Sequence, residues 1–219
     1  MTEMKRALAA IERHGVLLVY PLQNRREPLS LWHALHPRSE MRWAWDDGAD
    51  PRVVALWHLR EQLATSRQVV YAKWHGGRAT FFSRDVFRAM LATLRADHDL
   101  RLGLSRDSQT LLQLLEDDSP QATKQLREAA GLQGRPMETA YTRAMRDLWS
   151  RMLVVGAGEV AEGGFPSLAI GATQLLFEDL WEASAVLTDA DAALLERTLA
   201  DAPSFARTFR RVEKGLPVR

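Results

Sequence analysis

The chain has 219 residues, with 29 lysines and arginines, 28 aspartates and glutamates, and 46% hydrophobic residues. This length and composition are typical of a soluble globular protein and exclude the disordered and fibrous classes. The net charge of +1 excludes a uniformly basic nucleic-acid coat, so contact with nucleic acid would need a local basic patch. Because there is no cysteine, disulfides, thiolate metal sites and a cysteine nucleophile are also excluded.

The longest early apolar run, Val16 to Tyr20, is too short for the hydrophobic region of a signal peptide and far too short to cross a bilayer. The sequence therefore predicts a cytoplasmic protein with no membrane partner.

Residues 1–100 are predicted to form a tryptophan-rich α+β domain. Met1 to His14 carries apolar residues at three- and four-residue spacing, which predicts a helix, and Val16 to Leu22 predicts a buried strand. The prolines and glycine of Gln23 to Asp50 predict an irregular segment whose indoles fill gaps between elements. The tryptophans of this segment are Trp32, Trp43 and Trp45.

The second half of this domain carries clear start signals. Asp50-Pro51 predicts the first residues of a helix, because it combines an N-cap with a proline at the first helical position. Alternation over Gln68 to Phe82, around His75-Gly76-Gly77, predicts a β-hairpin. Ser83 is expected to cap a helix over Arg84 to Arg95.

Residues 101–187 are predicted to form a winged helix-turn-helix domain. A first helix follows Ser105, a second covers Gln121 to Ala130 and a third covers Met137 to Arg151, with short turns between them. Three helices joined in this way are the core of a helix-turn-helix.

The wing is expected in the glycine-rich segment that follows the third helix. Met152 to Val155 predicts a strand, Gly156 to Gly164 a loop and Phe165 to Gly171 a returning strand, with a further helix over Thr173 to Leu187. The order helix, helix, helix, strand, loop, strand is that of a winged helix. The predicted class is thus α+β, with an N-terminal helix/strand unit followed by a winged helix-turn-helix and C-terminal helices.

Residues 188–219 form the third predicted part, a C-terminal helix and a basic tail. Thr188 with Asp191 is typical of an N-cap with an acidic first turn. After Pro203 the tail is basic and follows an acidic stretch. It either pairs with those acids, within the fold or across a dimer, or lies on phosphate.

The third helix of the second domain carries the strongest functional signal. Its apolar positions, four residues apart, are Ala140, Ala144, Leu148 and Met152. This spacing leaves Thr139, Thr142, Arg143 and Arg146 on the outer face, where they are candidates for a DNA groove, and it places Arg135 before the helix for a phosphate contact. Residues 119–155 contain six Lys or Arg and three Asp or Glu, a local excess of three positive charges. The alternative is that these residues form an ordinary solvated helix face.

No cofactor, metal or catalytic site is predicted. Gly156 to Ala161 matches the dinucleotide fingerprint in its alanine variant, but Gly163 to Pro166 would break the helix that such a site needs. His33 and His36, near Glu40, lack a third ligand at zinc-site spacing. No nucleophile elbow, Walker loop or Ser-x-x-Lys pair is present, so the sequence assigns no catalytic residue.

The second domain resembles the winged-helix proteins related to the AlkZ/YcaQ DNA glycosylases. The resemblance rests on the helices at Leu111 to Leu115, Leu126 to Leu132 and Tyr141 to Leu153 and on the glycine wing, mainly within residues 105–187. Together with the segment Tyr71 to Phe82, it suggests a small relative of these enzymes. It implies a winged-helix fold and affinity for DNA. Those glycosylases use a Gln-x-Gln motif to excise damaged bases, and this chain has no such motif, so no catalytic residue is carried over.

The sequence leaves three candidate functions. The first is a DNA-binding module for repair or transcription regulation, with duplex DNA as partner and no nucleotide cofactor. The second is a protein-protein or dimerisation scaffold in which the winged helix is structural and a homodimer is the partner. The third is a DNA glycosylase-like hydrolase, for which Glu27 and Glu61 are the only candidate carboxylates and neither has a supporting motif.

Overall fold

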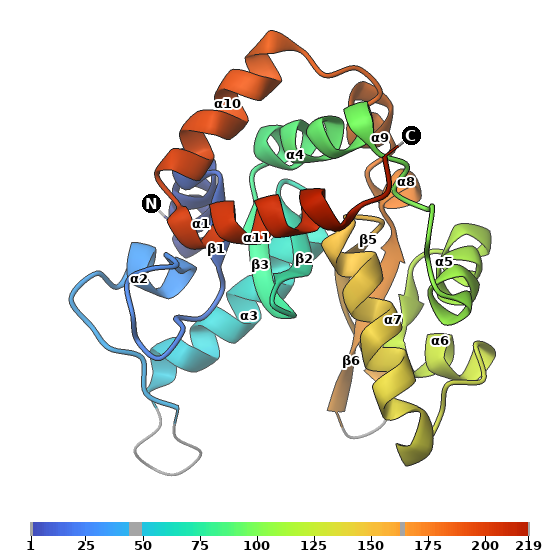
Figure 1. Cartoon of the computed structure of the whole chain (residues 1–219). Helices are drawn as coiled ribbons and strands as arrows, with labels where there is room; N and C mark the ends of the chain where they lie inside the picture. Colours follow the sequence, from blue (N-terminus) through green and yellow to red (C-terminus); the bar gives the residue numbers. More distant parts are fainter. Residues whose placement is uncertain (1, 44–49, 163–164, 219) are drawn as a thin grey trace.

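An antiparallel sheet organises the part of the chain that the structure describes, residues 2–43, 50–162 and 165–218 of a computed structural model. Its six strands lie in the order β1-β3-β2-β5-β6-β4 (Figure 1). They are β1 (Val16–Leu18), β2 (Val70–His75), β3 (Arg78–Phe82), β4 (Gln121–Ala122), β5 (Val154–Glu162) and β6 (Phe165–Ala172). Strands from the first and second halves of the chain therefore share one sheet, and the protein is α+β. The domain boundaries near residues 100 and 187 stay a prediction.

The two halves of the sheet meet where β2 pairs with β5, at Tyr71 opposite Gly156. A Cβ added to Gly156 would lie 2.2 Å from Cδ1 of the Tyr71 ring. That ring is 2% exposed and packs against Phe81, with the ring centroids 5.3 Å apart. The join therefore requires a residue without a side chain at position 156.

Two hydrophobic clusters cover the opposite faces of the sheet. Along β2, Val70, Ala72 and Trp74 belong to one cluster and Tyr71 belongs to the other, as expected because successive strand residues point to opposite faces. The Tyr71 face is covered by three helices. These are α1 (Glu3–His14), α2 (Leu31–Leu35) and α3 (Pro51–Ser66).

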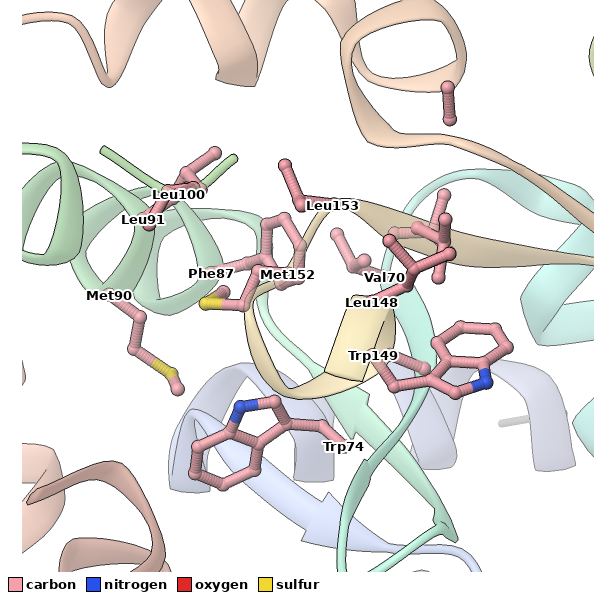
Figure 2. Close-up of a cluster of buried hydrophobic side chains, with 14 of the residues drawn as sticks. Val70, Trp74, Phe87, Met90, Leu91, Leu100, Leu148, Trp149, Met152 and Leu153 are labelled. Atoms are coloured by element: carbon pink, nitrogen blue, oxygen red, sulfur yellow. The ribbon is translucent and has the colours of Figure 1, made fainter. Parts of the chain in front are cut away.

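The Trp74 face is covered by helices from the rest of the chain. These are α4 (Arg84–Asp97), α5 (Arg106–Asp117), α6 (Thr123–Ala129), α7 (Glu138–Ser150), α8 (Thr173–Leu176), α9 (Glu178–Ala183), α10 (Asp189–Ala200) and α11 (Pro203–Gly215). Figure 2 shows the centre of this cluster, where Trp74 of β2, Phe87 of α4 and Leu148 and Trp149 of α7 gather. Both halves of the chain thus contribute to the cluster on this face.

Several predicted helix starts are confirmed. The side chains of Asp50, Ser83 and Ser105 each accept a hydrogen bond from a backbone N–H in the first turn of α3, α4 and α5. Thr188 and Asp191 form a complete capping box at the start of α10. The hairpin predicted over Gln68 to Phe82 is also confirmed as β2 and β3, which turn at Gly76-Gly77. Trp45 lies outside the described residues.

The predicted loop over Gly156 to Gly164 is wrong for its described part. Strand β5 continues to Glu162 and pairs with β6 from Val154 opposite Ala172 to Glu162 opposite Phe165. The register shifts between Gly156 and Glu159, where Gly158 adopts φ +106°. The glycines therefore serve a close contact and a bulge within a strand.

Other predicted elements have different bounds. The strand expected over Val16 to Leu22 ends at Leu18. In the segment Gln121 to Ala130, expected to be all helix, the first two residues form strand β4 and helix α6 follows. The helix expected over Thr173 to Leu187 breaks at Phe177 into α8 and α9.

The basic tail predicted after Pro203 is helix α11. Its residues Phe205 and Phe209, 1% and 3% exposed, lie one turn apart and pack into the core on the Trp74 face. Burial of these two rings holds the segment as a helix, because an amphipathic face stabilises a helix chiefly through tertiary packing.

We expect Gly156→Ala to destabilise the protein by about 1–3 kcal/mol, because the new methyl group overpacks the buried Tyr71 ring. For a chain of this size each kcal/mol corresponds to roughly 2–4 °C in Tm. The measurement is thermal unfolding followed by circular dichroism. Gly215→Ala is the matched control, since a Cβ there meets nothing within 4 Å. Equal Tm values for the two variants would contradict the steric account of the join.

Candidate nucleic-acid interface

Helix α7 separates a buried face from an exposed one. Its buried residues recur at spacings of three and four, which places them on one side of the helix. They are Tyr141, Ala144, Met145, Leu148 and Trp149. Thr139, Thr142, Arg143 and Arg146 are exposed on the other side. Arg135, also exposed, lies in the short 3-10 helix η1 (Arg135–Met137) that leads into α7.

Two of the basic residues counted in this region have structural partners. Arg127 forms an ion pair with Glu138 at 2.8 Å and lies over the Tyr141 ring, 4.6 Å from its centroid. Arg151, 8% exposed, forms an ion pair with Asp147 at 2.7 Å. Their charges are therefore used within the fold.

The remaining basic residues of the region differ from Arg127 and Arg151. Lys124, Arg135, Arg143 and Arg146 are exposed, and within residues 2–43, 50–162 and 165–218 none of them forms an ion pair. The Thr142 hydroxyl donates a hydrogen bond to Glu138 Oε1 at 3.4 Å, at the edge of the same face. The exposed side of α7 thus presents cations available to an outside anion.

A pocket of about 570 Å³ lies beside this face, between α7 and α11. Arg143 and Arg146 of α7 line it together with Arg211 of α11. Arg211 belongs to the tail for which the sequence left contact with phosphate open, but it was not predicted to lie beside the α7 residues, because α11 was interpreted as a tail. The spacing of Phe205 and Phe209 was the signal that could have identified the helix.

A second pocket, of about 400 Å³, lies between α7 and the β2–β3 hairpin. Lys73, Tyr141 and Trp149 line it, and Arg146 lines both pockets. Burial lowers the pKa of the Lys73 ammonium and raises the pKa of Tyr141 to about 12. The Tyr141 ring is therefore neutral at ordinary pH and serves as a packing surface.

The residues considered for catalysis or metal binding have contacts within the fold. The Glu27 carboxylate accepts hydrogen bonds from the backbone N–H and the hydroxyl of Ser204, at the start of α11. Glu61 lies on α3 beside Arg60, whose guanidinium forms an ion pair with Glu159. Among the described residues no group of three or more His, Asp or Glu could hold a metal ion. His33 Nδ1 lies 3.1 Å from the Ser30 hydroxyl.

Comparison with known proteins gives one match. A family model described as AlkZ related matches residues 1–199. The chain belongs to the AlkZ-related family. No curated protein and no solved structure matches it. The match ends at residue 199, before α11.

Over the described ranges, no helix of this AlkZ-related protein is long and apolar enough to cross a membrane.

His75 links the β2–β3 hairpin to α11. Its Nδ1 lies 3.0 Å from the Thr208 hydroxyl, and its ring meets Phe205 edge to face with the centroids 4.9 Å apart. Burial lowers the pKa of this imidazole below its ordinary value of 6.5, and the nearby Arg78 charge lowers it further, against the opposite effect of Glu27. The folded protein therefore favours the neutral ring.

We expect stability to fall as the pH drops below about 6.5, because the unfolded chain then takes up a proton that the folded state resists. Tm measured between pH 7.5 and 5.5 checks this expectation. Burial lowers the pKa values of His14, His33 and His36 as well, so the wild type should lose more stability than His75→Gln while the variant keeps part of the pH dependence. Superimposable pH profiles would exclude His75 as a contributor.

Proposed function

We propose that this AlkZ-related protein binds duplex DNA through the exposed face of α7. In this arrangement Thr139, Thr142, Arg143 and Arg146 face a groove, and Arg135 contacts a phosphate. The observation that carries the proposal is a set of exposed cations that form no ion pair in the described part of the chain and lie on one side of a helix whose other side is buried. The family membership supports a role connected with DNA repair. The proposal concerns binding and includes no base-excision step.

The order of elements around α7 supports a winged-helix interpretation. Helices α5, α6 and α7 are followed by the antiparallel pair β5 and β6, and the two-residue strand β4, between α5 and α6, pairs with β6. In a winged helix-turn-helix the helix before the hairpin enters the major groove and the hairpin lies against the backbone. Here these would be α7 and the β5–β6 hairpin.

The chemistry of the face suits both kinds of DNA contact. Guanidinium groups bind phosphates, or the O6 and N7 atoms of guanine, through two parallel hydrogen bonds. Threonines can donate to phosphates or contact a thymine methyl group. Since phosphate contacts release counterions, binding by this face must weaken as salt rises.

We expect the double variant Arg143→Ala/Arg146→Ala to bind a random-sequence fluorescent duplex at least tenfold more weakly than the wild type at low salt. On a random-sequence duplex these two arginines meet no preferred base and contact the phosphates at the edges of the groove. Each lost phosphate contact removes roughly 0.9 from the slope of log K against log salt, so the slope should fall by about two. Fluorescence anisotropy across a salt series measures both quantities.

The matched control is Arg25→Ala/Arg38→Ala, which removes the same charge from two exposed arginines outside α7. Its affinity should stay within twofold of the wild type. Equal losses in the two double variants would show that net charge, and not the α7 face, controls binding. If the wild type shows no salt-dependent binding, the proposal is wrong. The alternative is then a homodimer or another protein partner, and size-exclusion chromatography tests for the homodimer.

A further inference from the structure

We propose that the pocket between α7 and α11 binds a small organic anion with a planar apolar body, and that this ligand competes with DNA. The competition rests on the proposed function, whereas the binding of the ligand does not. The volume of the pocket, about 570 Å³, is within the range of small-molecule sites.

The anionic part of the ligand follows from the charges around the pocket. Arg143, Arg146 and Arg211 line it from two helices, and none of them forms an ion pair in the described part of the chain. The one carboxylate in the lining, Asp147, is already paired with Arg151. Arg143, Arg146 and Arg211 thus place three guanidinium groups around one concavity, and an anion bound there can form charge-assisted hydrogen bonds with them.

The start of α5 adds to this preference. The first turn of α5 lines it through Ser105 and Ser108, so the positive end of a twelve-residue helix lies at its wall. Ser150 and Thr208 also line the pocket, but their hydroxyls already hydrogen-bond within the fold, to the Asp147 carbonyl and to the Ser204 carbonyl. The arginines therefore supply the principal polar contacts to the anion.

The apolar part of the ligand follows from the remaining lining. Trp74 and Leu216, 3% and 7% exposed, and the half-buried Val212 form an apolar wall. A sugar-phosphate backbone makes polar contacts and would leave such a wall unused. A ring carrying a carboxylate, sulfonate or phosphate uses both parts, which favours a small molecule over a DNA strand as the occupant.

Competition follows because two residues belong to both sites. Arg143 and Arg146 lie on the proposed DNA face of α7 and also line the pocket. An anion bound to their guanidinium groups neutralises the charge that phosphates would contact. Thermodynamic linkage then requires that each occupant weaken the other by the same factor.

The test uses 8-anilinonaphthalene-1-sulfonate, an aromatic sulfonate that becomes fluorescent in apolar surroundings, with the full chain and no DNA. We expect one site per chain, and at least fivefold weaker binding by Arg211→Ala. Arg210→Ala, which changes an exposed neighbour on α11 outside the pocket lining, should bind within twofold of the wild type. N-phenyl-1-naphthylamine, which lacks the sulfonate, should bind at least tenfold more weakly.

Equal dye affinity in Arg211→Ala and Arg210→Ala, or equal affinity for the neutral dye, overturns the anion site. A second arm adds the random-sequence duplex, which should displace the dye from the wild type. If the duplex binds and the dye stays, the competition is wrong. If the duplex does not bind, the proposed function fails, and the first arm still decides whether the pocket takes an anion.

Discussion

The position of α7 depends on the burial of its inner face against β2. Trp74 of β2 packs beneath the end of the helix, and its indole N–H donates a hydrogen bond to the Ser150 carbonyl at 3.3 Å. Leu148 and Trp149 fill the same cluster from α7 (Figure 2). Because close-packed side chains leave a helix few alternative orientations, the outer face of α7 is set by what its inner face buries.

Arg151 extends this constraint to the segment that leads into α5. Its buried guanidinium is paired with Asp147 and also donates to the carbonyls of Leu100 and Leu102, at 3.1 and 2.7 Å. A buried charge is tolerated only when it is paired and hydrogen-bonded, and here those bonds tie the end of α7 to residues 100–102. The first turn of α5, which follows, is thereby held at the wall of the larger pocket.

The features that could be predicted from the sequence are those with local causes. Ser83 and Ser105 mark helix starts because a cap joins a side chain to a backbone N–H within the first turn. The prediction of a loop beginning at Gly156 was wrong because a distant contact requires this glycine. The Tyr71 ring, 85 positions away in the chain, leaves no space for a side chain at position 156. Helix α11 was missed because basic composition concealed the spacing of its buried phenylalanines.

The candidate site shows the same division between local and tertiary causes. Periodicity alone predicted which side of α7 faces outward. The sequence could not show which arginines have free charges, since Arg127 and Arg143 are chemically identical and differ only in whether a carboxylate of the fold lies beside them. Nor could it bring Arg211 to the same pocket as Arg143, because that proximity depends on how α11 packs.

The attachments of α11 determine how the two proposed sites are connected. Glu27 binds the start of this helix through Ser204, and His75 binds its middle through Thr208. These contacts fix the wall that carries Arg211, while the opposite wall, α7, is fixed by the core. A ligand between two fixed walls acts on DNA binding through charge and occupancy at Arg143 and Arg146, without a change of fold. The strength of such coupling is limited by the share of the DNA contact energy that those two arginines supply.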